Sequence, residues 1–219
     1  MRVRARKSSR GFTLVELLIG ATLSAAIMAA VLSSYLYLGR GLARLANQQK
    51  LETEGRRTLG YFTQDVAAAT TVTVTTTTAP DFYITFTVPT TATGVRQVIY
   101  RYSQAGGTIS VGATIVTIPA RSLVRVTATA SALVVSSQTL LSNIVTGNNG
   151  CYIRFYDAAG TAYDNGSAPY TPVTAYSLGI KQAMLAFQTQ LGSAAAGTQT
   201  PMYAVASGRL VMRNKTFLP

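Results

Sequence analysis

The stretch that decides the fold, residues 11–38, reads GFTLVELLIGATLSAAIMAAVLSSYLYL. Between Gly11 and Arg40 the only charged side chain is Glu16. Residues 12–38 would form a helix of about 40 Å at about 1.5 Å per residue, whereas the hydrocarbon core of a bilayer is about 30 Å thick. The stretch therefore predicts a transmembrane helix.

The residues on either side of this run predict its orientation. Residues 1–10 (MRVRARKSSR) contain five basic residues, against Arg40 and Arg44 just beyond the run. Basic residues favour the cytoplasmic side, so we expect the N-terminus inside and the bulk of the chain exported. An ordinary secretory signal has an apolar region of about 7–15 residues with a small-residue cleavage site after it, a pattern that differs from this one.

Glu16 is anomalous, because an ionisable side chain in a lipid-embedded helix is costly unless it has a partner. If the chain were cut after Gly11, the new amine of Phe12 would lie about 6 Å from Glu16 along the helix axis. The same amine on a neighbouring copy would be a second counter-charge. Such pairing would set the register between subunits.

The residues G-FTLVELLI after a short basic leader resemble the signal of type IV prepilins and pseudopilins. The resemblance implies that a prepilin peptidase cuts between Gly11 and Phe12 and methylates the amine of Phe12. It also implies that Glu16 guides assembly of the helix into a filament core. Many major pilins have a proline in the apolar run, and its absence here favours a pseudopilin or minor subunit.

The composition argues against an enzyme. The chain has no histidine, one cysteine and seven acidic residues, so general bases, metal ligands and activated nucleophiles are scarce. We expect no catalytic residues, no cofactor and no metal ligands. Cys151 has no second cysteine to pair with and is expected to be a small buried apolar residue.

Beyond the apolar run, the pattern predicts an amphipathic continuation of the helix over residues 39–69, with an apolar stripe at Leu51, Gly55, Leu59, Phe62 and Val66. Residues 70–80 are Thr-rich and fit an edge strand or a loose connector. Strand-like runs separated by Pro, Gly and Asn then recur at residues 81–88, 95–103, 108–118, 122–129, 150–157 and 179–190. The expected parts are a leader (1–11), a transmembrane helix (12–38), its continuation (39–69) and a β-rich domain (70–219).

The predicted fold class is α+β, with the long N-terminal helix packed on one antiparallel β-sheet, as in type IV pilins. Three later segments, residues 140–160, 180–190 and 207–214, resemble the skeleton of J-type pseudopilins of type II secretion and W-type minor pilins. That resemblance implies a short helix, then a strand ending in an aromatic-Asp-x-x-Gly turn, then another strand and an Arg-Asn ending.

Two further patterns were candidate sites. The loop with Asp157, Asp164 and Asn165 contains oxygen ligands, but its spacing is not that of an EF-hand, and a hairpin turn explains it better. Tyrosines around Arg101 and Arg154 are compatible with a surface that stacks on single-stranded nucleic acid, although alternating strand faces explain them better. Without residues 1–11 the chain retains 14 basic against seven acidic residues.

The sequence therefore predicts a minor pilin or pseudopilin that helps initiate assembly of a type IV pilus or type II secretion pseudopilus. By resemblance, its partners are prepilin peptidase, other pilins, membrane lipid, and an inner-membrane assembly platform with its ATPase. The precursor is expected in the inner membrane and the mature form in the filament. The alternatives are a pilus-displayed adhesin that binds DNA or a surface, and a membrane-anchored domain that never polymerises.

Overall fold

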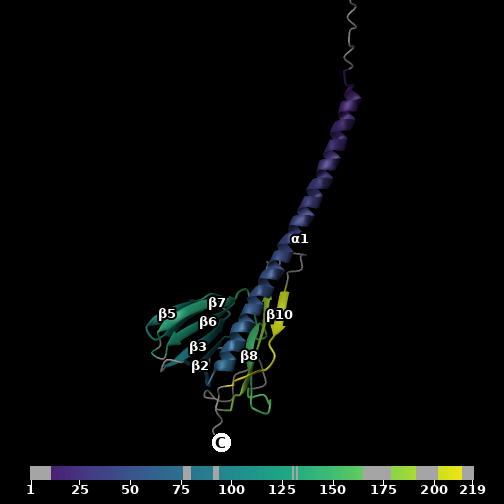
Figure 1. Ribbon diagram of the computed structural model, residues 1–219. Coiled ribbons are helices and arrows are strands. Elements are labelled where there is room, and N and C mark those ends of the chain that lie inside the picture. Colours follow the sequence, from purple (N-terminus) through teal and green to yellow (C-terminus); the bar gives the residue numbers. More distant parts are fainter. Residues whose placement is uncertain are drawn as a thin grey trace, which may run out of the picture. The chain divides into compact units, whose positions relative to one another are not determined.

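The computed structural model describes residues 11–75, 80–90, 94–129, 131, 133–164, 179–190 and 202–213 (Figure 1). A single helix, α1, runs from Leu14 to Ala68 and is followed by eleven strands within these ranges. The chain divides into two compact units, Met1–Ala46 and Asn47–Pro219, so α1 contributes to both.

The part of α1 in the first unit has no buried side chain, and its large apolar residues are half exposed or more. This helix is long and apolar enough to cross a membrane, with a mean hydropathy of 2.1 over its most apolar window. Because water does not favour so much exposed apolar surface, the helix requires lipid or other protein around it.

The part of α1 in the second unit buries one face. Leu51, Gly55, Phe62 and Val66 are buried and Leu59 packs against the core, which confirms the stripe expected from the sequence. Two polar residues, Thr58 and Asp65, are buried on the same face.

The described residues form three β-sheets, so the expectation of one sheet was wrong. The five-stranded sheet has the order β1-β2-β3-β6-β7, with every neighbouring pair antiparallel. In the four-stranded sheet, β9 pairs with β8 on one side and with β10 and β11 on the other, while β4 and β5 form a hairpin. The bounds are β1 (Thr71–Thr75), β2 (Phe82–Thr90), β3 (Gly94–Ser103), β4 (Gly107–Val111), β5 (Thr114–Ile118), β6 (Ser122–Thr129), β7 (Val134–Leu141), β8 (Cys151–Tyr156), β9 (Gln182–Gln190), β10 (Met202–Ala206) and β11 (Leu210–Val211).

The local turns explain these differences. The sequence suggested one strand over residues 108–118, but Gly112 has a φ of 57°, which turns the chain into the β4–β5 hairpin. The short helix implied for the start of residues 140–160 is also absent, since β7 extends to Leu141 and Asn143 adopts a φ of 55°. Of the two alternatives for the Thr-rich stretch, residues 71–75 form an edge strand.

Two apolar clusters hold the second unit together. The larger joins Phe62 and Val66 of α1 to residues of both larger sheets, and Figure 1 shows strands of these sheets beside this part of α1. Phe62 makes edge-to-face contacts with Phe86 and Tyr100, with ring centroids 6.0 and 5.6 Å apart. The smaller cluster lies between the β4–β5 hairpin and strands β3 and β6. Together they confirm an α+β arrangement like that of type IV pilins.

Candidate functional site

The N-terminus of α1 contains the residues singled out from the sequence. Gly11, Phe12 and Thr13 precede the helix, which begins at Leu14. Phe12 is 85% exposed, and a methyl group added at Gly11 would meet no atom within 4 Å. The peptide bond between Gly11 and Phe12 therefore lies in open, non-helical backbone, as an endoprotease substrate requires.

Glu16 closes a reciprocal hydrogen-bonded cap with Thr13. The backbone N–H and the hydroxyl of Thr13 each donate to Glu16 Oε2 at 3.0 Å, and the N–H of Glu16 donates to Thr13 Oγ1 at 3.2 Å. This is the capping box of a helix N-terminus, in which Thr is the N-cap and Glu is the third helical residue. A carboxylate in the first turn also interacts favourably with the helix dipole.

The cap revises the interpretation of Glu16. From the sequence, Glu16 needed a counter-charge, yet in the single chain Thr13 already satisfies the carboxylate with two donors. The carboxylate is still accessible, because Glu16 is exposed. The T-x-x-E spacing of Thr13 and Glu16 is itself a sequence signal for a capping box, and it would have identified Thr13.

The tyrosines on either side of Arg101, in one of the two patterns compatible with nucleic-acid binding, belong to the core. Tyr100 and Tyr102 are fully buried, so they cannot stack on bases. Arg101 lies between them in sequence and forms an ion pair with Asp81 at 3.1 Å. Burial raises the pKa of Tyr102 to about 12. The Arg101 pattern is thus explained by packing.

Arg154, the arginine of the second tyrosine pattern, contacts the loop that contains Asp157 and Asp164. Asp164, whose side chain is fully buried, forms an ion pair with Arg154 at 3.1 Å. Asp157 accepts a hydrogen bond from the N–H of Thr161 at 2.8 Å, as in a turn. Asn165 lies outside the described residues. Among the residues that the structure describes, no group of three or more His, Cys, Asp or Glu could hold a metal ion.

Cys151 lies at the start of β8 and is fully buried, as expected. Burial raises the pKa of its thiol, so it remains protonated and unreactive at neutral pH. Its environment is that of a core residue.

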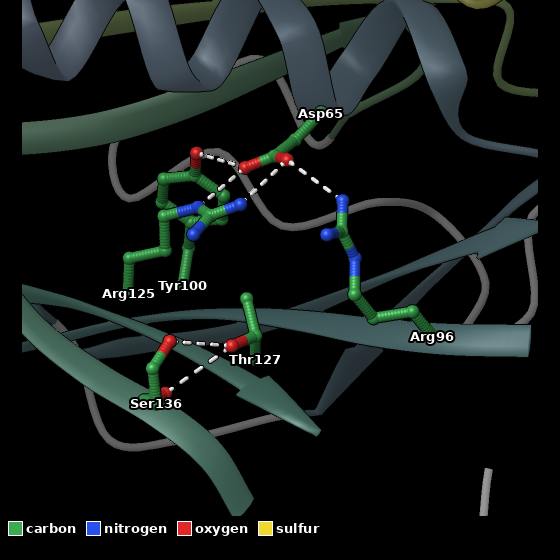
Figure 2. A network of polar contacts seen from close by, with 6 residues as sticks. All are labelled: Asp65, Arg96, Tyr100, Arg125, Thr127 and Ser136. Atoms are coloured by element: carbon green, nitrogen blue, oxygen red, sulfur yellow. Dashed lines mark hydrogen bonds and ion pairs between the residues drawn. The ribbon is translucent and has the colours of Figure 1, made fainter. Parts of the chain in front are cut away.

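A buried polar network that the sequence did not indicate joins α1 to the five-stranded sheet (Figure 2). Arg125 of β6 donates two hydrogen bonds to Asp65, at 2.7 and 2.8 Å, and the hydroxyl of Tyr100 donates a third at 2.7 Å. Arg96 approaches Asp65 to 4.0 Å. Burial and the Asp65 carboxylate raise the pKa of Tyr100 well above its ordinary value. The network anchors α1 rather than forming a reactive site.

Comparison with known protein families identifies the N-terminal segment. Residues 6–32 match the family model of the prokaryotic N-terminal methylation motif. The chain carries a type IV prepilin signal. Comparisons with curated proteins and with solved structures found no match.

The prepilin signal supports a type IV pilin-like or pseudopilin protein, and such proteins are usually structural subunits. It suggests processing by prepilin peptidase and assembly with other pilins. Together with the exposed apolar helix, it fits a precursor anchored in the inner membrane. The match includes Gly11, Phe12, Thr13 and Glu16, so the motif and the capping box coincide.

Proposed function

We propose that this protein is a minor pilin or pseudopilin, a structural subunit that helps initiate assembly of a type IV pilus or a type II secretion pseudopilus. In this proposal the parts are a leader (residues 1–11), a membrane helix (12–38), its continuation (39–69) and a β-rich domain (70–219). The observation that carries the proposal is the prepilin signal, which coincides with an accessible Gly11–Phe12 bond and a capped helix start.

Processing is the first step of the proposed mechanism. Prepilin peptidase cuts between Gly11 and Phe12 and methylates the Phe12 amine. The protease needs non-helical backbone with room around it, and the surroundings of Gly11 are compatible with both requirements. The side chain of valine would restrict the backbone and occupy that space.

Assembly is the second step. The apolar helix leaves the bilayer because neighbouring helices bury it in the filament, and an assembly ATPase supplies the work. The capping box holds the Glu16 carboxylate at the end of the helix, where the amine of Phe12, on the same or a neighbouring subunit, is the proposed counter-charge. This pairing sets the axial stagger of the subunits.

Mass spectrometry of the native protein tests processing. The expected N-terminus is a methylated Phe12, and Gly11→Val is expected to leave the precursor uncut. An intact N-terminus in cells with a working prepilin peptidase would contradict the proposal and favour a membrane-anchored domain that never polymerises.

Two substitutions of Glu16 test assembly separately from the helix cap. Glu16→Gln removes the charge but keeps an acceptor for the capping box, whereas Glu16→Ala removes both. Both variants should be cleaved normally, and both should be strongly depleted from sheared filaments on immunoblots. Normal incorporation of Glu16→Gln alone would show that the cap is sufficient, and normal incorporation of both would remove Glu16 from the mechanism.

A further inference from the structure

Aromatic and basic side chains lie where the apolar run of α1 ends. Tyr35 and Tyr37 are 75% and 80% exposed. Arg40 and Arg44 follow, both exposed, and their side chains contact no acidic residue within the described part of the chain. No acidic residue occurs in the sequence between Glu16 and Glu52. This segment therefore presents positive charge with no internal neutralisation.

Three of these side chains share one side of the helix. Tyr37, Arg40 and Arg44 line a surface hollow of about 440 Å³ on this exposed helix, together with Leu38, Gly41 and Leu42. Their spacing of three and four residues places them one above the other on an α-helix. Other arginines of the chain are engaged differently: Arg56, Arg101 and Arg125, for example, each have an acidic partner.

The chemistry of this cluster matches the interface of a membrane. Tyrosine favours the boundary between hydrocarbon and headgroups, and the fork of an arginine binds phosphate. Basic residues on the exported flank of a membrane helix also oppose the positive-inside rule, so Arg40 and Arg44 weaken the signal that orients the chain. A role other than topology would account for their presence.

We propose that Tyr37, Arg40 and Arg44 bind the headgroups of anionic phospholipids on the exported side of the membrane and so fix the depth of α1. The inference rests on the proposed function, since it requires a precursor held in the membrane. The occupant of the hollow is the phosphate of a lipid headgroup.

The length of the helix gives this contact a consequence for the processing site. Glu16 and Arg40 are 24 residues apart, which is about 36 Å along the axis, or about 34 Å with a tilt of about 20°. The hydrocarbon core is only about 30 Å thick. With Arg40 among the exported headgroups, Glu16 lies at the cytoplasmic interface, and the Gly11–Phe12 bond lies in the cytoplasm.

The apolar run is longer than the bilayer requires, so its depth is not determined by hydrophobicity alone. Residues 12–38 exceed the hydrocarbon thickness by about 10 Å. Without an anchor, the helix can slide toward the exported side by up to this length and draw Glu16 into lipid. The headgroup contact made by Tyr37, Arg40 and Arg44 holds the helix at the depth where the Glu16 carboxylate remains hydrated.

Depth measurements on the full chain in vesicles test the inference. Spin labels at Leu17→Cys or Leu36→Cys, in a Cys151→Ala background, report depth from their collisions with oxygen and with a polar nickel chelate. The vesicles contain phosphatidylcholine alone or with 30% phosphatidylglycerol. Arg40→Gln/Arg44→Gln should shift both labels by up to about 10 Å in the anionic vesicles.

Lys50→Gln is the matched control. It removes a positive charge six residues beyond Arg44, about 9 Å farther along a helix. That distance exceeds the Debye length of about 8 Å at physiological ionic strength, so the depth should not change. The leader is identical in every chain, and therefore its own attraction to anionic lipid cancels in the comparison.

Flotation after carbonate extraction distinguishes a failure of the proposed membrane-held precursor from a failure of the lipid contact alone. A wild-type chain that does not remain in the vesicles would overturn the proposed membrane-held precursor and this inference with it. A chain that remains inserted, but at the same depth with and without Arg40 and Arg44, would overturn only the lipid contact. An equal shift in Lys50→Gln would likewise reject a specific role for the two arginines.

Discussion

The two parts of helix α1 differ in where their partners lie. In the first unit, the helix buries no residue, and Glu16 finds its hydrogen bonds within its own turn. In the second unit, the helix buries an apolar face, and Asp65 finds its partners on strands 35 and 60 residues away. The first part depends on lipid or other chains, whereas the second part is a core element of its own domain.

The comparison shows that one continuous helix need not have one source of stability. Local hydrogen bonds and propensity form α1 along its full length. Packing stabilises only the part that contacts the sheets. Substitutions in this second part should therefore change the unfolding of the domain according to burial, and three substitutions arranged by size test this.

The largest effect is expected from Asp65→Asn. The substitution leaves the Arg125 guanidinium buried beside a neutral group, and breaking a buried ion pair in this way costs about 3–5 kcal/mol. Urea unfolding of the full chain in detergent, followed by circular dichroism, gives the free energy of unfolding. A loss below about 1 kcal/mol, the range of surface pairs, would show that the network does not anchor the helix.

An intermediate effect is expected from Gly55→Ala. A methyl group at Gly55 would approach Tyr203 Cε1 to 2.5 Å, so the ring must move, and overpacking of this kind costs about 1–3 kcal/mol. Gly60 lies in the same helix with nothing within 4 Å of its added methyl group. Gly60→Ala is the control and should stabilise the domain by up to about 1 kcal/mol. Equal effects at both positions would show that space at Gly55 is not limiting.

The smallest effect is expected from Glu52→Gln. Glu52 and Arg56 form an ion pair at 2.6 Å, but their side chains are 48% and 78% exposed. Such pairs contribute about 0.3–0.5 kcal/mol, and salt screens them. The same unfolding measurement should show this small loss in dilute buffer and none in 1 M salt. A loss as large as that of Asp65→Asn would mean that burial does not distinguish the two pairs.

Several predictions from the sequence depended on local patterns and were confirmed. The periodic stripe of Leu51, Gly55, Phe62 and Val66 identified the packed face of α1, because helical periodicity follows from backbone geometry alone. Cys151 was correctly expected in the core. The T-x-x-E pattern of Thr13 and Glu16 is equally local, and the capping box was therefore available from the sequence.

Other features depended on contacts between distant residues. The partition of the strands into three sheets required knowing that β8 pairs with β9, about 30 residues later, and that the β4–β5 hairpin covers β3 and β6. Strand β7 was not predicted from the sequence, because its buried and exposed residues do not follow the alternation expected of a strand. The partners of Asp65 come from β3 and β6, and no local pattern indicates them.

The sequence by itself determined the apolar helix, the prepilin signal and the positions of Gly11, Phe12 and Glu16, because these features depend on composition and spacing within about 30 residues. Only the tertiary structure decided which polar residues became core. Asp65 and Asp164 are buried beside arginines, whereas Glu52 is exposed and Asp157 is a half-buried turn residue. A carboxylate is stable in the interior only where the fold brings a cation to it. The residues next to it in the sequence do not indicate which cation that will be.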